Sequence, residues 1–271
     1  MSKGVLVDVT RCMGCKSCQV ACKSWNDLPA NVPDVPEFSD GLNSPAETNG
    51  YTYTTVAIRT VAREDDYVLR FCKRQCMHCL EPACVSACFA RALQRDPQTG
   101  AVVYNQNMCV GCRYCMLACP FNIPKFQWDK TFPIIGKCQF CFDPNGKLNR
   151  IGQGLAPACV RTCPTSALQF GEREALLKEA RERIKKNPAY IKHIYGEKEI
   201  GGTAWLYISD TPLEIFGFRQ DLGTRPLPEY TASYLKFTPY VAVGWTILLT
   251  ALYLYTKRRE AVEEEKKSAQ G

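Results

Sequence analysis

The sequence holds few of the groups from which active sites are built. Only two of its 271 residues are histidines, and it contains no nucleophile–base arrangement, no phosphate loop and no metal site with an open position. We therefore expect no catalytic residue and no substrate pocket of its own in this chain. Residues 1–8 also lack the charged and apolar segments of a signal peptide and carry no twin-arginine pair.

Cysteine, by contrast, is abundant, with 17 in the chain. Sixteen of them fall into four tight runs, and cysteines this close in sequence favour metal ligation over a disulfide framework. The runs are Cys12, Cys15, Cys18 and Cys22; Cys76, Cys79, Cys84 and Cys88; Cys109, Cys112, Cys115 and Cys119; and Cys138, Cys141, Cys159 and Cys163. The third run, followed by Pro120, has the C-x2-C-x2-C-x3-C spacing with which bacterial ferredoxins hold iron–sulfur clusters. The first run has the same spacing, and the two runs share a glycine, Gly14 and Gly111, that permits a tight turn.

The formal net charge of +7 does not indicate a nucleic-acid partner. That value counts every cysteine as neutral, whereas four [4Fe–4S] cubes with thiolate ligands would add about −8. The loaded protein is therefore expected to be close to neutral. We expect the basic residues near the motifs to offset cluster charge; they are Arg11, Lys16, Lys23, Lys73, Arg74, Arg113 and Lys137.

Internal repetition groups the runs into two ferredoxin-like units. The segment 82–88 recurs at 157–163, and each copy is followed four residues later by Ala-Leu. In two-cluster ferredoxins the fourth cysteine of each run serves the other cluster. The second and third runs lie about as close as ferredoxin halves and are expected to pair, which pairs the first and fourth by elimination. One ferredoxin unit is thus predicted to be inserted between the halves of the other.

This pairing predicts four [4Fe–4S] clusters as cofactors, each held by four thiolates. The predicted ligand sets are set 1 (Cys12, Cys15, Cys18 and Cys163), set 2 (Cys22, Cys138, Cys141 and Cys159), set 3 (Cys76, Cys79, Cys84 and Cys119) and set 4 (Cys88, Cys109, Cys112 and Cys115). Zinc is the main alternative metal for C-x2-C pairs, but the compact three-cysteine spacing suits a cube better. Cys72 is left over and is expected to pack as a small hydrophobic residue. His78, inside the second run, is expected to hydrogen-bond or pack rather than bind iron, and His193 to have no special role.

Residues 237–255 form a stretch of 19 residues without a charge, close to the ~20 apolar residues that span a bilayer. Aromatic residues lie near both ends, and Lys257, Arg258 and Arg259 follow directly. The excess of positive charge after the stretch predicts a single pass through the inner (cell) membrane, with a cytoplasmic C-terminus and the cysteine-rich part on the periplasmic face. The alternative is a buried core helix.

The fold class expected is α+β, with tandem two-cluster ferredoxin-like modules and one C-terminal transmembrane helix. Strands are expected in 1–10, 51–61, 101–104 and 203–209, a loop over 29–50 and an amphipathic helix over 172–186. The predicted domains are 1–35, the first half of the outer module; 36–70, an insertion and strand; 71–130, the inserted module; 131–170, the second half of the outer module; 171–234, a C-terminal extension; 235–256, the transmembrane helix; and 257–271, a cytoplasmic tail.

Several motifs resemble the four-cluster iron–sulfur subunits of membrane-bound molybdopterin oxidoreductases and uptake hydrogenases. Val7-Asp8 with C-M-G-C-K-S-C-Q-V-A-C-K-S-W-N-D at 12–27 looks like the beta subunit of respiratory formate dehydrogenase. C-V-G-C-R-Y-C-M-L-A-C-P-F-N-I-P at 109–124 is similar to both groups. The segments Y-G-E-K-E at 195–199 and G-G-T at 201–203 look more like the ferredoxin-like anchor subunit of periplasmic nickel–iron hydrogenases. The departures are Lys23 and Phe89, which follow the last cysteine of their runs in place of the usual proline.

The resemblance implies a non-catalytic subunit that carries electrons through four clusters. Its donor would be a large catalytic subunit, of the molybdopterin type in formate dehydrogenase or the nickel–iron type in hydrogenase. Its acceptor would be a membrane cytochrome b or another quinone-reactive subunit. Formate dehydrogenase is the favoured reading, hydrogenase or another sulfur or oxyanion oxidoreductase is the alternative, and a structural zinc scaffold would use the same cysteines without electron transfer.

Overall fold

The computed structural model describes residues 2–29, 45–63, 66–132, 134–143 and 149–269. The chain divides into two compact units, Met1–Leu227 and Pro228–Gly271. The first unit carries all the cysteines and is a mixed α/β structure, whereas the second consists of one long helix.

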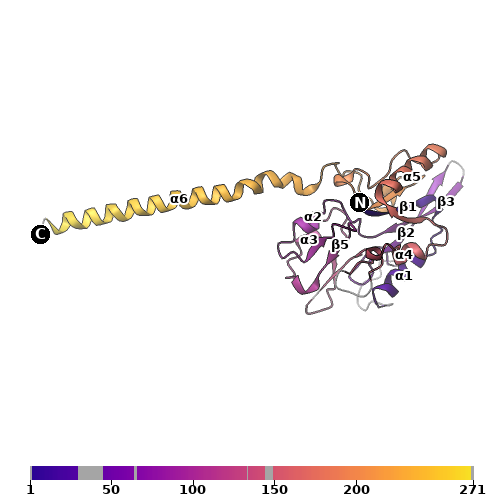
Figure 1. The fold of residues 1–271 in the computed structure, drawn as a ribbon, viewed down its shortest axis with the longest axis horizontal. Coiled ribbons are helices and arrows are strands. Elements are labelled where there is room, and N and C mark those ends of the chain that lie inside the picture. Colours follow the sequence, from indigo (N-terminus) through magenta and orange to yellow (C-terminus); the bar gives the residue numbers. More distant parts are fainter. Residues whose placement is uncertain (1, 30–44, 64–65, 133, 144–148, 270–271) are drawn as a thin grey trace. The chain divides into compact units, whose positions relative to one another are not determined.

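The N-terminal strand β1 (Lys3–Asp8) is the centre of the first unit. It lies between β8 (Leu168–Glu172), which pairs with it antiparallel, and β9 (Trp205–Ile208), which pairs with it parallel. Because both faces of β1 are covered, its alternate residues enter two different cores. Leu6 packs with Leu176 and Leu177 of helix α5 (Arg173–Lys186), whereas Val5 and Val7 face the larger core among the cysteine loops. Figure 1 shows α5 lying next to β1, in agreement with their contacts.

The remaining strands form three small antiparallel pairs. β2 (Thr55–Arg63) pairs with β3 (Asp66–Arg74), β4 (Leu93–Arg95) with β5 (Val102–Tyr104), and β6 (Lys125–Phe126) with β7 (Ile135–Gly136). Four short helices accompany the cysteine runs: α1 (Ser17–Trp25), α2 (Ala83–Ser86), α3 (Tyr114–Ala118) and α4 (Ala158–Arg161). α1 packs beside α4, and α2 beside α3 (Figure 1). Short 3-10 turns lie at Val9–Arg11, Gln106–Met108, Ile151–Gln153, Glu199–Gly201 and Leu213–Phe216.

The expected strands overlap with β1, β2, β5 and β9, and the expected helix over 172–186 coincides with α5. The long strand β3 and the short strands β4, β6, β7 and β8 were not expected from the sequence. Residues 30–44 of the expected loop lie outside the described part of the chain.

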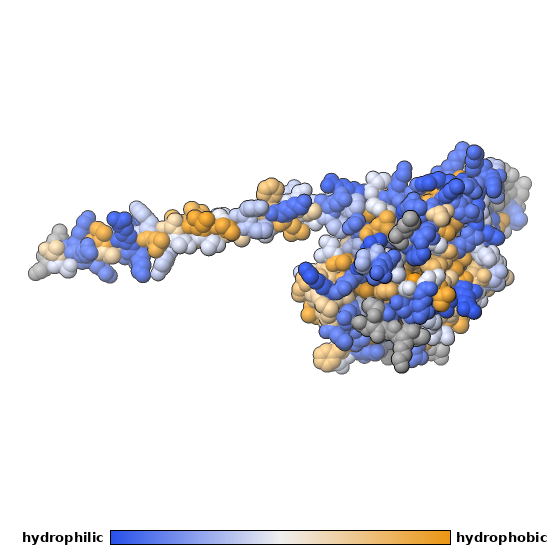
Figure 2. Space-filling view, viewed as in Figure 1, coloured by the Kyte–Doolittle hydropathy of each residue, from blue (hydrophilic) through white to orange (hydrophobic). Residues whose placement is uncertain are grey.

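The second unit is helix α6 (Leu227–Ser268), which contains the predicted span and extends beyond it at both ends. Within the described residues it is the one helix long and apolar enough to cross a membrane. Figure 2 shows apolar side chains along its middle and hydrophilic ones towards its C-terminal end. Pro239 lies within the helix, near the start of the uncharged stretch. A helix of this length and apolar composition fits a membrane anchor.

Candidate iron–sulfur sites

All four cysteine runs have a residue with left-handed backbone at the same position of their first C-x2-C segment. The residue before the second cysteine has a positive φ in each run, and these residues are Gly14 (72°), His78 (47°), Gly111 (70°) and Phe140 (62°). The two glycines adopt this left-handed conformation without cost, as expected from the sequence. For residues with a Cβ it costs about 1–2 kcal/mol, so other contacts must hold His78 and Phe140 in the turn.

Each run ends on or beside a short helix. Cys22 lies in α1 and Cys119 at the C-terminal end of α3, while Cys88 and Cys163 follow α2 and α4 by two residues. Since α1 packs beside α4 and α2 beside α3, the last cysteine of one run comes close to the first three of its partner run.

The thiols of set 1 lie close enough to act on one another electrostatically. Burial raises the pKa of the Cys12 thiol, and Cys163 and Cys15 raise it further, while the backbone N–H of Gly14 lowers it. Burial raises the pKa of Cys18 to about 11, and the other three members of set 1 act in the same direction. All four thiols, together with Lys73, line one cavity.

Set 4 has the same arrangement in the other half of the unit. Burial raises the pKa of Cys115 to about 11, and Cys109, Cys112 and Cys88 add to the increase. These four thiols also line a cavity of their own, together with Arg113.

Sets 2 and 3 are the most deeply buried. Burial raises the pKa of the Cys22 thiol well above its usual value, and Cys138, Cys159 and Cys141 raise it further. The pKa of Cys79 is likewise raised well above its usual value by burial, followed by Cys76, Cys119 and Cys84. Each predicted set therefore consists of thiols that are neighbours in space.

The donor groups of these sets fit an iron–sulfur cluster. Soft thiolates are the ligands such clusters take, and a cube distributes its four thiolates over four iron atoms. Backbone N–H groups donate to several of the sulfurs, for example Phe140 N to Cys138 Sγ at 3.4 Å and Ala158 N to Cys141 Sγ at 3.5 Å. Hydrogen bonds to ligand sulfur are a recognised means of tuning such sites. Among the described residues no three histidine, cysteine or acidic groups converge closely enough for a single metal ion.

His78 is held between two of the cysteine loops. Its Nδ1 accepts a hydrogen bond from the backbone N–H of Val102 at 2.9 Å, and its ring stacks on Phe140 with centroids 4.8 Å apart. Burial lowers the pKa of His78 well below its usual value, and Lys137 and Lys73 lower it further, so the ring is neutral and carries its proton on Nε2. Within the described part of the chain, this fully buried Nε2 has no hydrogen-bond partner.

The two other residues singled out from the sequence lie outside the sets. Cys72 is fully buried in β3 and belongs to the larger hydrophobic core, where burial raises the pKa of its thiol. The Nε2 of His193 lies 2.7 Å from Glu199 Oε1 at the surface, with half of its side chain exposed.

The sequence indicated Lys73 and Lys137 only as two of several nearby basic residues. Both side chains are almost completely buried, at 2 % exposure. Only their position within the fold, which the sequence does not disclose, separates them from the surface lysines.

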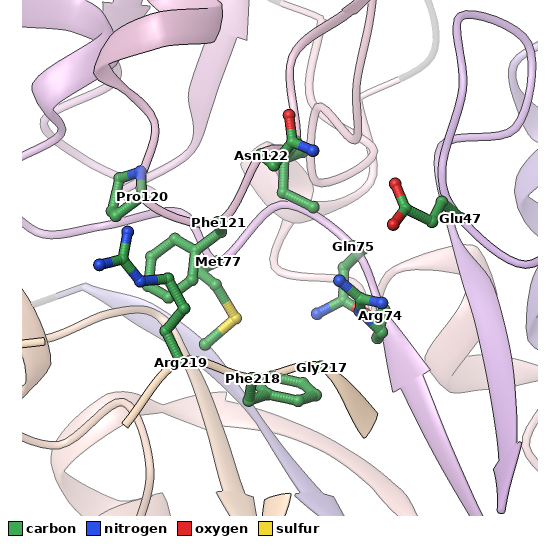
Figure 3. A pocket seen from close by; sticks show the side chains of 11 residues that line it. Glu47, Arg74, Gln75, Met77, Pro120, Phe121, Asn122, Gly217, Phe218 and Arg219 are labelled. Atoms are coloured by element: carbon green, nitrogen blue, oxygen red, sulfur yellow. The ribbon is translucent and has the colours of Figure 1, made fainter. Parts of the chain in front are cut away.

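A separate pocket of about 210 Å³ lies beside set 3. Figure 3 shows Met77, Phe121 and Phe218 lining it, with Arg219 on one side and Arg74 on the other. No cysteine lines this pocket among the described residues, so it is distinct from the cluster cavities.

The comparisons with known proteins agree with this site. Residues 67–173 match the 4Fe-4S dicluster domain family. The chain is 45% identical over 269 residues to a protein of Nitratidesulfovibrio vulgaris (strain Hildenborough), covering 98% of this chain and 70% of that protein. It is 34% identical to the nitrate-inducible formate dehydrogenase iron-sulfur subunit of Escherichia coli K12, covering 92% and 83%. It is also 34% identical to the hydrogenase-2 operon protein HybA of Escherichia coli O157:H7, covering 79% and 71%.

The thiol sets and these similarities define an iron–sulfur electron-transfer protein with a 4Fe-4S ferredoxin-like domain. The chain belongs to the family of iron–sulfur subunits of the formate dehydrogenase and hydrogenase type. Its single apolar C-terminal helix fits membrane anchoring, and its relatives imply a catalytic partner subunit.

Proposed function

We propose that this chain relays electrons through four [4Fe–4S] clusters, from a molybdopterin-containing catalytic subunit of formate dehydrogenase type to a membrane cytochrome b or other quinone-reactive subunit. The clusters are held by sets 1 to 4, and the chain itself contributes no catalytic residue. The observation that carries this proposal is the grouping of all sixteen thiols into four neighbouring sets.

Electrostatic influences between thiols of different sets support a single line of clusters. Burial is the main cause of the raised pKa of Cys159 in set 2, and Cys18 of set 1 raises this pKa further. Cys76 of set 3 acts on the buried Cys138 of set 2 in the same way, so sets 2 and 3 are neighbours. Cys115 of set 4 acts on the buried Cys84 of set 3. The order supported is therefore set 1, set 2, set 3, set 4.

The inserted-module arrangement is supported by the two helix pairs. α1 and α4 flank the outer sets 1 and 2, whereas α2 and α3, with the hairpin β4–β5 between them in sequence, flank the inner sets 3 and 4. This is the organisation proposed for residues 1–35 and 131–170 as the outer module and 71–130 as the inserted one. The segments 36–70 and 171–234 are proposed as additions to these modules.

Exposure at the two ends of the line supports a hand-over to partner subunits. Of the 17 cysteines, all of which the structure describes, only Cys15 of set 1 and Cys112 of set 4 are exposed. Large apolar side chains are exposed around both, namely Met13 and Val20 near Cys15, and Val110, Tyr114 and Leu117 near Cys112. Exposed apolar surface of this kind is typical of protein–protein contacts. We assign the two ends to the catalytic and the membrane partner.

The protein contributes position, burial and charge. When bound, each cluster accepts and releases one electron at a time. The cysteine loops fix the sites in a row, the apolar residues packed around the cysteines exclude water, and N–H groups and buried lysines compensate negative charge. The lysine and arginine residues after the apolar stretch of α6 support a cytoplasmic C-terminus, with the iron–sulfur unit on the periplasmic face of the membrane.

A hydrogenase partner is the second candidate. The similarity to HybA favours it. The segment 195–203, which resembles the hydrogenase subunits, lies next to set 3, because Thr203 pairs with Cys79 in a β-bridge.

The test uses the detergent-extracted complex, kept free of oxygen. In the iron analysis this chain should account for about 16 atoms, in addition to the iron of its partner subunits. Formate is added to one sample, hydrogen to a second and dithionite to a third, and cluster spectra are recorded. Reduction by formate alone supports the first proposal, and reduction by hydrogen alone supports the second. A colourless, zinc-containing protein would contradict both.

A further inference from the structure

Lys73 is a cation in the interior of the cysteine-rich unit. It lies near the end of β3, opposite Val56 of β2, and its side chain is 2 % exposed. Nζ donates a hydrogen bond to Gln75 Oε1 at 2.8 Å and lies 4.5 Å from the centre of the Trp205 ring. A buried ammonium group is strongly unfavourable unless negative charge compensates it.

The compensating charge does not come from a carboxylate. Among the residues that the structure describes, no aspartate or glutamate forms an ion pair with Lys73. Lys73 instead lines the same cavity as the four thiols of set 1.

The electrostatic neighbours of Lys73 come from two sets. Burial, the largest single effect, lowers the pKa of Lys73, but four thiolates together raise it above its usual value. They are Cys159, Cys18, Cys138 and Cys22. One of these belongs to set 1 and three belong to set 2, so a single ammonium group lies within reach of both sets.

We propose that Lys73 is a shared counter-cation of the clusters held by sets 1 and 2, and that its fixed charge raises the reduction potentials of both. This rests on the proposed function, because it presupposes clusters at those sets. Reduction adds negative charge, which a neighbouring cation stabilises, and more strongly in a buried site than in water. Because the same cation serves both sites, it moves their potentials together. An electron passing from one cluster to the other therefore remains beside the same positive charge.

Lys137 provides a matched control. It is equally buried, and its Nζ donates to the backbone oxygens of Val102 and Cys138. Its charge lowers the pKa of Cys84 and Cys119 against the raising effect of their burial. Both thiols belong to set 3, whereas Lys137 is not among the main electrostatic influences on Cys138 of set 2, so neutralising Lys137 is expected to act mainly on the inner module.

The test compares Lys73→Met, Lys73→Arg and Lys137→Met in the intact complex, using potentiometric titration followed by electron paramagnetic resonance. At the wild-type midpoint of each outer cluster, Lys73→Met is expected to lower the ratio of reduced to oxidised cluster about tenfold, which is 59 mV for one electron. The clusters of sets 3 and 4 should change far less. Lys73→Arg, which keeps the charge, should restore both outer potentials, and Lys137→Met should mainly shift set 3.

Iron content and the number of reducible clusters are measured first in the wild type, because fewer than four clusters contradicts the proposed function itself. With four clusters present, unchanged outer potentials in Lys73→Met overturn the inference and leave the proposed function intact. A shift of only one outer cluster also overturns it. If Lys73→Met fails to assemble clusters, Lys73→Arg becomes the deciding variant. Four clusters with outer potentials near the wild-type values would support the role of the charge. Loss of clusters or displaced outer potentials would overturn the inference.

Discussion

His78 and Phe140 stack on each other with ring centroids 4.8 Å apart, although 61 residues separate them in the sequence. Each occupies the left-handed position of its own C-x2-C turn, one in the second cysteine run and one in the fourth. The stack therefore joins the turn of the proposed inserted module to the turn of the outer module. It also supplies the packing that holds two side chains in a backbone conformation that glycine adopts in the other two runs.

Replacing His78 by valine should destabilise this junction. A β-branched residue is poorly tolerated at positive φ, and the stack is lost, so we expect a loss of about 2–4 kcal/mol. The temperature at which cluster absorbance is lost, measured without oxygen, reports the change. His78→Asn serves as the control because asparagine tolerates left-handed backbone, and it should lose less. Equal loss in both variants would show that backbone strain plays no part.

Gly14 and Gly111 provide a matched pair with similar φ but different surroundings. A Cβ on Gly14 would lie 2.3 Å from the Phe71 ring, whereas a Cβ on Gly111 would meet nothing within 4 Å. Gly111→Ala should cost about 1–2 kcal/mol from backbone strain alone, and Gly14→Ala should cost more. Thermal stability and iron content of both variants check this. The explanation fails if Gly111→Ala is the more damaging of the two.

The crossed assignment of ligands makes a site-specific prediction. Cys119 lies in the third run but belongs to set 3, so Cys119→Ala should remove or convert the cluster held by Cys76, Cys79 and Cys84. The cluster of set 4 should survive. Cys88→Ala is the reciprocal variant and should affect set 4. Spectra that show only the set 4 cluster lost in Cys119→Ala would contradict the crossing.

The pair between Arg183 and Asp8 connects α5 to the strand that leads into the first cysteine run. Asp8 is fully buried, and its Oδ2 accepts hydrogen bonds from Arg183 Nη1 at 3.0 Å and from Tyr190 Oη at 2.9 Å. Arg183→Met leaves the carboxylate without its charge partner and should cost about 3 kcal/mol. Arg181→Met breaks an exposed pair with Glu197 and should cost less than about 1 kcal/mol. Thermal denaturation distinguishes them, and similar losses would argue against a structural role for the buried pair.

The orientation of α6 is tested with reporters fused to the C-terminus. A fluorescent protein that folds only in the cytoplasm should be bright there, and alkaline phosphatase should be inactive. The control is a chain ending at Leu227, which lacks the helix and should leave the membrane fraction when expressed without its partners. An active phosphatase at the full-length C-terminus would reverse the proposed topology.

The proposed cysteine grouping could be predicted from the sequence because each predicted set draws three of its four thiols from one run. The period-two pattern of Val5, Val7 and Val9 and the apolar face of α5 were equally local signals. The left-handed turn at His78 was not accessible, because it depends on Phe140 from a distant segment. The burial of Lys73 could not be predicted either. Lys73 directly precedes Arg74 at the end of β3, and it is covered by Trp205, which lies more than a hundred residues further along the chain.

The central position of β1 has a consequence for how the protein is made. On the ribosome β1 emerges well before both of its neighbours, β8 and β9, which lie beyond residue 167. The N-terminal strand must therefore wait, without its sheet partners, until most of the chain has been synthesised. Sets 3 and 4 are complete once Cys119 has emerged, whereas sets 1 and 2 require Cys163 and Cys159. We therefore expect the inner module to take up its iron first. The outer module should be completed only after β8 and β9 have been synthesised and have paired with β1.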